Sequence, residues 1–172
     1  HKSPAYKAHN PKGKVPAILI DGEALTENVA IITLLNERFP EAGLLPAARD
    51  PMAKARQLAD LCFCAATLHP IVTRIRMPQL ICDQPAAIPR VREMACDSMA
   101  FQLRGLEQSL QQQPWVLLGA DWSVLDGYLY WVWFRITGAG FDASPFPAIA
   151  AHTLRMEERP AVQRALQRES RA

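Results

Sequence analysis

The 172-residue sequence lacks the features that mark several large classes of protein. No apolar run reaches the roughly 18 residues of a membrane-spanning helix. No apolar h-region follows His1, so we expect neither a signal peptide nor a membrane as partner. The formal charge of +2 is nearly neutral, which gives no reason to expect nucleic acid as a partner. Apolar residues make up 49% of the chain, so a substantial core is predicted.

The four cysteines lack the spacing of a metal site. Cys62 and Cys64 lie two residues apart, which separates them by about 200° on a helix, so they cannot share one ion. Cys82 and Cys96 stand alone in segments with a helical pattern. We therefore predict no metal and interpret all four as reduced core thiols in a cytoplasmic protein.

The first 45 residues indicate mixed helix and strand. The pattern predicts four elements: a short helix over residues 3–8, a strand over 16–20, a partner strand over 23–25 and a helix over 27–38. Asp21-Gly22 is a strong signal for a two-residue hairpin turn, and Thr26 is expected to cap the second helix. A hairpin with one or two helices cannot bury both faces of a sheet. The region therefore looks incomplete, as though further strands lie upstream of the given chain.

Residues 46–50 indicate a linker, and the remainder is helical in pattern. Helices are predicted over residues 51–80 with a bend near His69-Pro70, and over 89–113, 123–136, 146–158 and 160–168. Ser123 and Asp126 resemble a capping box, and the nearly all-apolar residues 127–136 after them favour a helix buried inside a bundle. The fold class predicted from these patterns is an α+β region followed by an all-α helical bundle.

Two short motifs point to a binding function. Residues 10–16 read Asn-Pro-Lys-Gly-Lys-Val-Pro, a turn that leads into proline-restricted backbone, and residues 25–31 read Leu-Thr-Glu-Asn-Val-Ala-Ile, the start of a helix. Main-chain groups in the first motif and the helix N-terminus in the second could hold a small zwitterionic peptide. When each motif is considered alone, a plain tight turn explains the first, and an acidic residue in the first helical turn explains the second.

In order and spacing, these motifs resemble the glutathione S-transferase family, particularly its bacterial cytosolic members. The resemblance covers essentially the whole chain and includes the Asp-Gly hairpin, the Ser-x-x-Asp helix start and residues 158–162 (Glu-Arg-Pro-Ala-Val). It implies the glutathione S-transferase fold, in which residues 1–45 are the C-terminal part of a thioredoxin-like domain and residues 46–172 an all-helical domain. It also implies a homodimer.

The resemblance assigns roles to individual residues. The bond before Pro16 is expected to be cis, which would turn the N–H and C=O of Val15 outward to pair with the cysteinyl part of glutathione. Glu27 and Asn28 match the positions that hold the γ-glutamyl end, and Lys14 could meet the glycyl carboxylate. As alternatives, Glu27 only favours the first helical turn, and Lys14 is a solvated lysine.

His69 matches a position that faces the active-site cleft in some bacterial relatives, so it is a weak candidate for the second-substrate cleft. A packed or partly exposed helix residue is the alternative for His69. In the family, the group that activates the thiol is a Tyr, Ser or Cys near the end of the first strand, and nothing here matches that strand. Ser3 and Tyr6 lie in the wrong element, so the catalytic residue is unknown and is expected outside the given chain.

The function implied by the resemblance is conjugation of the glutathione thiolate to a hydrophobic electrophile, a detoxification reaction. Glutathione would be a co-substrate, and no cofactor is expected. One alternative is a glutathione-dependent isomerase or dehalogenase. The other is a non-catalytic protein that keeps the fold for binding or as a scaffold.

Overall fold

A computed structural model describes residues 1–116 and 121–170. The chain divides into two compact units, His1–Ala65 and Ala66–Ala172. The elements of the first unit are α1 (Pro4–His9), β1 (Ala17–Ile20), β2 (Glu23–Thr26), α2 (Asn28–Arg38), a 3-10 turn (Pro40–Ala42) and α3 (Pro51–Cys62). The first unit thus extends beyond residues 1–45 and includes the helix α3.

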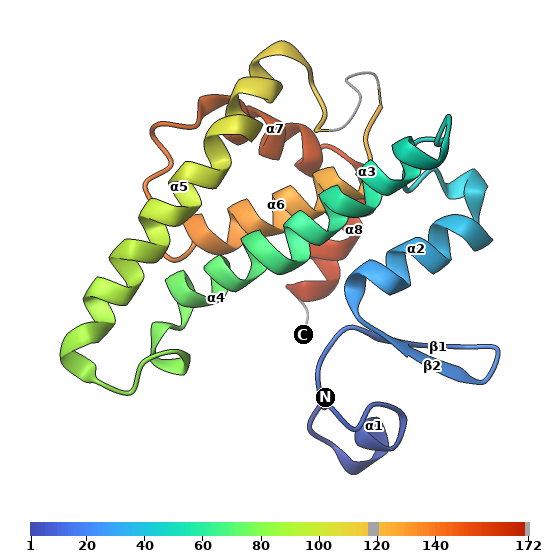
Figure 1. Cartoon of the computed structure of the whole chain (residues 1–172), viewed down its shortest axis with the longest axis horizontal. Coiled ribbons are helices and arrows are strands. Elements are labelled where there is room, and N and C mark those ends of the chain that lie inside the picture. Colours follow the sequence, from blue (N-terminus) through green and yellow to red (C-terminus); the bar gives the residue numbers. More distant parts are fainter. Residues whose placement is uncertain (117–120, 171–172) are drawn as a thin grey trace. The chain divides into compact units, whose positions relative to one another are not determined.

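The strands β1 and β2 form the predicted antiparallel hairpin (Figure 1). Asp21 and Gly22 both have positive φ angles, 51° and 83°, as a two-residue type I′ turn requires. This turn pairs Ile20 with Glu23 and Ala17 with Thr26. A hydrogen bond from the Arg38 guanidinium holds the pKa of the Asp21 carboxyl below its usual value and ties the turn to the end of α2.

The prediction that Thr26 caps α2 is wrong. Thr26 is the last residue of β2, and Glu27 stands at the N-cap position without a side-chain capping bond. The chain turns from strand into helix through Glu27, whose φ angle of 73° is uncommon for a residue with a side chain. Ile31 and Ile32 are buried on α2, which packs on both strands.

The predicted long helix after the linker is interrupted in its middle. A π-helical segment, Phe63–Leu68, joins α3 to α4 (His69–Arg76). Pro70 lacks a backbone N–H, and its ring would collide with the carbonyl four residues earlier in regular helix, so the irregular segment precedes it. In the described part of the chain, the stretch Pro51–Arg76 is long and apolar enough to cross a membrane, a test that core helices of soluble proteins also pass.

The second unit is a helical bundle. After α4 come two 3-10 turns (Pro78–Leu80 and Pro85–Ala87), α5 (Ile88–Gln112), α6 (Val124–Thr137), α7 (Pro147–Glu157) and α8 (Pro160–Glu169). Contacts join α4 to α5 and α6, and α7 to α5 and α6, so these four helices surround one core (Figure 1). The apolar helix α6 contributes buried Leu125, Leu129, Val132 and Ile136, as predicted.

The cysteines differ from their predicted setting. Cys64 is buried, and burial raises its pKa to about 12, so this thiol is an inert core residue. Cys62 is exposed, whereas Cys82 and Cys96 are partly exposed, and Cys82 lies in the turn between α4 and α5 rather than in a helix. The interpretation as core thiols therefore holds for one of the four.

A buried carboxylate from one helix caps another. Glu107 of α5 is 6% exposed and accepts hydrogen bonds from the N–H groups of Ala148 and Ile149, at 2.9 and 3.0 Å. These N–H groups belong to the first turn of α7, which has no capping side chain of its own. Glu107 therefore satisfies donors that a helix N-terminus leaves unpaired and fixes α7 against α5.

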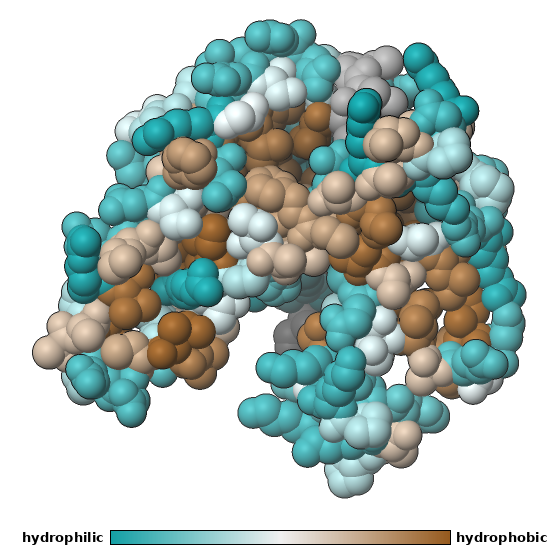
Figure 2. Space-filling view, viewed as in Figure 1, coloured by the Kyte–Doolittle hydropathy of each residue, from teal (hydrophilic) through white to brown (hydrophobic). Residues whose placement is uncertain are grey.

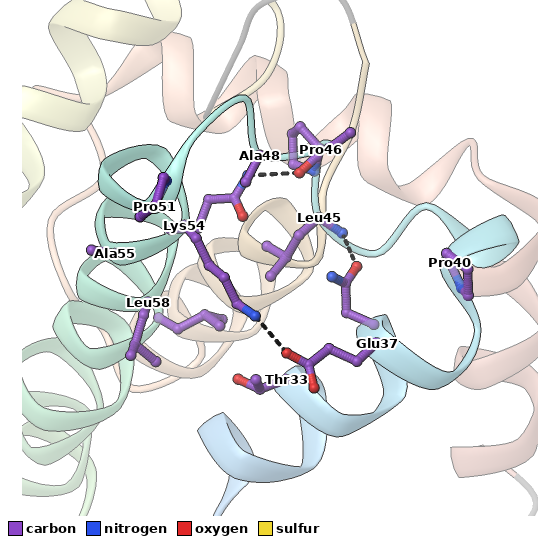
Figure 3. Close-up of a pocket in the computed structure, with 14 residues that line it drawn as sticks. Thr33, Glu37, Pro40, Leu45, Pro46, Ala48, Pro51, Lys54, Ala55 and Leu58 are labelled. Carbon is purple, nitrogen blue, oxygen red and sulfur yellow. Dashed lines mark hydrogen bonds and ion pairs between the residues drawn. The ribbon is translucent and has the colours of Figure 1, made fainter.

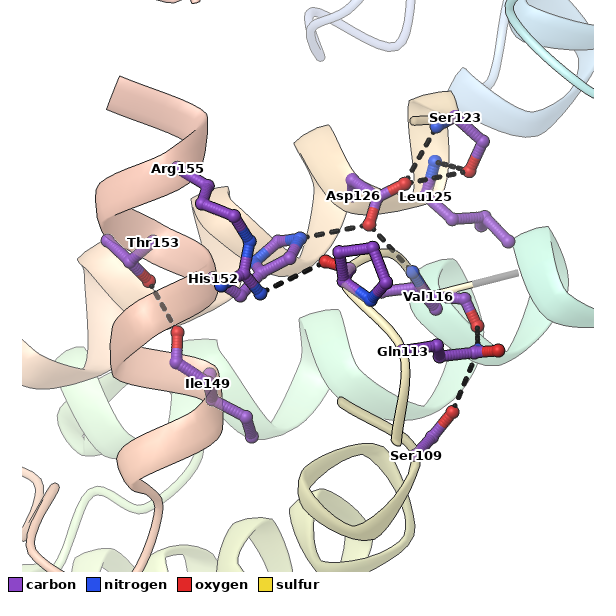
Figure 4. A network of polar contacts seen from close by, with 11 residues as sticks. Ser109, Gln113, Val116, Ser123, Leu125, Asp126, Ile149, His152, Thr153 and Arg155 are labelled. Carbon is purple, nitrogen blue, oxygen red and sulfur yellow. Dashed lines mark hydrogen bonds and ion pairs between the residues drawn. The ribbon is translucent and has the colours of Figure 1, made fainter. Parts of the chain in front are cut away.

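A second buried carboxylate, Asp126, organises the start of α6 (Figure 4). Asp126 and Ser123 form the predicted capping box. The Asp126 carboxylate also accepts from the Val116 N–H at 2.8 Å and contacts His152 Nε2 of α7 at 2.9 Å. Asp126 and His152 are both fully buried. One side chain thus joins the segment before α6, the α6 N-terminus and α7.

We expect Asp126→Ala to lower the free energy of unfolding by about 3 kcal/mol or more, because it leaves several buried donors without an acceptor. Urea unfolding measures the change. The control is Asp83→Ala, at an exposed position where the described structure shows no polar partner, and we expect a change within about 0.5 kcal/mol there. A loss below about 1 kcal/mol for Asp126→Ala would contradict the role given to this carboxylate.

Candidate functional site

The hairpin brings the two sequence motifs to the same place. Because Ala17 lies opposite Thr26, the residues just beyond this pair, Pro16 and Glu27, lie at the same open end of the hairpin. The ion pair between Lys12 Nζ and Glu27 Oε1, at 3.0 Å, shows that the first motif reaches the start of α2. The structure therefore gathers Val15, Pro16 and Glu27 in one region, although they are separated by the whole hairpin in sequence.

The N-terminus of α2 offers donors to a ligand. The first N–H groups of any helix have no intrahelical partner and carry a partial positive charge. At α2 no side chain caps them, because the Glu27 carboxylate turns to Lys12 instead. Asn28, the first residue of α2, is half-buried, and its amide has no hydrogen bond within the described residues. An anionic group placed here would meet unpaired donors.

The Glu27 carboxylate is accessible although it is paired. The side chains of Lys12 and Glu27 are 62% and 72% exposed, so water screens their attraction. A ligand ammonium can therefore take the place of the Lys12 ammonium. The positive φ of Glu27 marks a conformation that costs free energy and that clusters at ligand sites in proteins.

The segment before the hairpin presents its backbone outward. The Val15–Pro16 bond is cis, as the family resemblance implies. Val15 is 67% exposed, and its main-chain N–H and C=O have no hydrogen-bond partner in the described residues. Lys14 is exposed, and its ammonium forms no ion pair with any residue that the structure describes. Unpaired, accessible main-chain groups of this kind can pair with an extended peptide.

The residues that support this segment were not identified from the sequence. Tyr6 Oη donates to the Lys14 carbonyl at 2.5 Å, and Asn10 Nδ2 donates to the same oxygen at 2.7 Å. Ser3 caps α1 by accepting from the Tyr6 N–H. Both hydroxyls thus have structural partners. The one available signal was Asn10, since a polar residue before a turn often bonds to its own backbone.

His69, in the second unit, lies in an aromatic cluster of its own. Its Nδ1 is 3.1 Å from the Tyr128 hydroxyl, and its ring lies 4.4 Å from that of Trp131. Burial lowers the pKa of His69, which keeps the imidazole neutral at pH 7. The side chain remains partly accessible, so it can contact an apolar ligand.

A cavity of about 520 Å³ lies elsewhere in the first unit, between α2, the linker and α3 (Figure 3). Its walls are mostly apolar and include Leu45, Pro46 and Leu58. Its charged groups are already paired, since Lys54 Nζ lies 2.7 Å from Glu37 Oε1. None of the residues assigned to glutathione lines this cavity, so the candidate site is the open end of the hairpin.

Comparison with known proteins identifies the family that this chain resembles. Residues 1–38 match the family model described as the glutathione S-transferase N-terminal domain. A maleylacetoacetate isomerase from Pseudomonas aeruginosa is 42% identical over 72 residues, which cover 41% of this chain and 33% of that protein.

Longer matches cover nearly the whole chain. The glutathione S-transferase GstA of Escherichia coli O157:H7 is 33% identical over 166 residues, 95% of this chain and 78% of that protein. The structure of a sphingomonad glutathione S-transferase complexed with glutathione superposes with a TM-score of 0.82 at 32% identity, over 97% of this chain and 79% of that one. This chain, with its two-stranded sheet followed by a helical bundle, has the fold of that glutathione S-transferase. The chain belongs to the glutathione S-transferase family.

Proposed function

We propose that this protein attaches the thiolate of glutathione to a hydrophobic electrophile. The observation that carries the proposal is the meeting of unpaired Val15 main-chain groups with the uncapped α2 N-terminus at one end of the hairpin. Both motifs belong to a chain that is 33% identical to a glutathione S-transferase. We further propose that residues 1–45 belong to the glutathione-binding domain and residues 46–172 to the helical domain.

Each end of glutathione has a matching group at this site. The α-carboxylate of the γ-glutamyl residue fits the N-terminus of α2 and the Asn28 amide, whereas its ammonium fits the Glu27 carboxylate in place of Lys12. The cysteinyl residue pairs with the Val15 N–H and C=O as an added strand would. The Lys14 ammonium faces the glycyl carboxylate. Binding along the chain in this way holds the thiol at one defined position, from which it attacks the electrophile.

The aromatic cluster around His69 is the proposed contact for the second substrate. Trp131, which is partly exposed and packs against the buried Tyr128, offers apolar surface, and the neutral imidazole adds a polar group that carries no charge. A hydrophobic electrophile that has left water gains from such surface. The proposed setting is cytoplasmic, where thiols stay reduced.

The second candidate function is glutathione-dependent isomerisation. The 42% identity to a maleylacetoacetate isomerase over 72 residues favours it, although this stretch is less than half of the chain. The two functions share the glutathione site and differ in the second substrate. A third possibility, binding without turnover, uses the same contacts.

We expect the intact protein to conjugate glutathione to an aryl halide, with a rate that saturates in glutathione. Product absorbance measures conjugation, and a parallel assay with maleylacetoacetate tests isomerisation. Isomerisation without conjugation favours the second function. Glutathione uptake in calorimetry without either reaction leaves only a binding role.

We expect Glu27→Gln to raise the Kd for glutathione about ten-fold, because it removes a charge-assisted hydrogen bond to the ligand ammonium. Isothermal titration calorimetry measures the change. Glu23→Gln is the matched control, since Glu23 is an exposed glutamate on β2 of the same hairpin. Equal weakening by both substitutions would show a general charge effect instead of a contact at Glu27.

We expect His69→Gln to raise the KM for the aryl halide about five-fold, through loss of the ring contact with Trp131, and to leave the KM for glutathione within two-fold. Steady-state kinetics with each substrate varied in turn gives both values. His9→Gln is the control, because His9 is an exposed histidine of α1. A rise in the KM for glutathione alone would show that His69 acts at the glutathione site and not at the site of the second substrate.

We also propose that the protein forms a homodimer. Figure 2 shows hydrophobic side chains gathered over the connection between α4 and α5, where Leu80 and Ile81 are exposed. Met94 and Phe101, seven residues apart on α5, are exposed as well, at 56% and 65%. Large exposed apolar side chains along one stretch of surface are typical of protein interfaces.

Phe101→Glu is expected to convert the dimer to a monomer, because a partner would then have to bury an unpaired charge. Sedimentation velocity distinguishes the two states. Leu154→Glu, at an exposed apolar position of α7, serves as the control and should stay dimeric. A wild-type protein that sediments only as a monomer would contradict the proposal.

A further inference from the structure

The carbonyl oxygen of Lys14 accepts two hydrogen bonds from the segment that precedes it. Tyr6 Oη donates at 2.5 Å and Asn10 Nδ2 at 2.7 Å. Asn10 is 2% exposed, and its backbone N–H donates to the Tyr6 carbonyl at 2.9 Å, while its own carbonyl accepts from the Gly13 N–H at 2.9 Å. Asn10 Nδ2 also donates to the Tyr6 hydroxyl, at 3.5 Å. Asn10 is thus fixed by four bonds, and the Tyr6 hydroxyl completes the set on Lys14.

This arrangement determines where the next N–H points. The Lys14 carbonyl and the Val15 N–H belong to one planar peptide unit. The bond between them is trans, since the cis bond in the described chain is the one after Val15. In a trans unit the two groups point in opposite directions, so donors that hold the Lys14 oxygen on the inner side turn the Val15 N–H to the outer side. There it lacks a partner within the described residues.

The same two bonds strengthen the outward N–H as a donor. A carbonyl that accepts hydrogen bonds withdraws electron density from its own peptide group, so bonds along a chain polarise one another. A ligand carbonyl that binds the Val15 N–H extends this chain to Tyr6 and Asn10. The Tyr6 hydroxyl therefore influences the ligand through the peptide plane, without touching it.

We propose that Tyr6 is a positioning residue for glutathione, whose hydroxyl, together with Asn10, aims the Val15 N–H at the cysteinyl part of the peptide. This inference rests on the proposed function of the site. This role differs from that of the group that activates the thiol, because the Tyr6 hydroxyl already donates to a main-chain oxygen.

Tyr6→Phe removes the hydroxyl, and with it the bond to the Lys14 oxygen and the long bond from Asn10 Nδ2, but it keeps the ring and leaves Asn10 on the Lys14 oxygen, so the fold should persist. Loss of one of the two neutral hydrogen bonds on the Lys14 oxygen corresponds to about a five-fold change in affinity. We expect the KM for glutathione to rise about five-fold, with kcat at saturating glutathione and the KM for the aryl halide within two-fold of the wild type. The Kd for S-methylglutathione should rise by the same factor, since this ligand tests binding without the thiol.

Two further measurements separate positioning from other roles. The amide resonance of Val15 should shift in free Tyr6→Phe protein, and the pH at which bound glutathione ionises, followed by thiolate absorbance, should stay that of the wild type. Tyr130→Phe is the matched control, because its hydroxyl bonds to Glu157 in the second unit. We expect wild-type glutathione kinetics from it.

The outcomes are distinguishable. Wild-type protein that neither binds nor uses glutathione overturns the proposed function, and the positioning role with it. Wild-type protein that binds glutathione, with a Tyr6→Phe variant of unchanged KM, overturns the positioning role alone. A lower kcat with a raised ionisation pH of the bound thiol shows that Tyr6 acts on the sulfur, and a loss of melting temperature with equal loss of every kinetic constant shows a role in folding only.

Discussion

The site depends on the register of one short hairpin. The Asp21-Gly22 turn allows a two-residue connection, and the pairing that follows sets Ala17 against Thr26. A shift by one residue would turn every strand side chain to the opposite face and separate the Val15 backbone from the start of α2. The turn lies at the far end of the hairpin, so residues that never meet a ligand decide whether the binding groups come together. The Arg38 guanidinium on Asp21 adds support to this turn from α2.

The helical unit is held together by buried carboxylates as well as by its apolar core. Glu107 caps α7 from α5, and Asp126 joins α6 to His152 of α7. In both cases a charge that would be costly alone is surrounded by donors that the helix ends leave unpaired. Apolar packing tolerates small shifts of one helix along another, whereas these bonds accept a single arrangement. They therefore specify how α7 lies in the bundle.

Local signals in the sequence predicted most of the elements. The Asp-Gly turn, the Ser123–Asp126 capping box and the apolar run of α6 each carry their own short-range signature, and the structure confirms all three. The prediction for Thr26 was wrong because the positive φ of Glu27, which only the surrounding fold can enforce, moves the helix start by one residue. The cap on α7 was invisible because Glu107 and Ile149 are brought together only by the packing of two helices.

For the candidate site as well, contiguous motifs could be recognised in the sequence, whereas contacts made across a turn could not. Glu27, Asn28 and the segment before Pro16 could be selected from motifs, since each motif is contiguous. The roles of Lys12, Tyr6 and Asn10 could not, because they depend on which side of a turn faces inward. The sequence also gave no reason to join Lys12 with Glu27, which lies on the other side of the hairpin.

The pairing of Lys12 with Glu27 affects what an empty site will accept. The lysine is attached to the same chain, so it competes at a high effective concentration and is never diluted away. A free amine or a simple cation offers the carboxylate no more than Lys12 already does. A molecule that brings an ammonium together with a carboxylate and an extended backbone gains several contacts in exchange for one. Under the proposed function, the ion pair thus disfavours small amines relative to a peptide that makes several contacts.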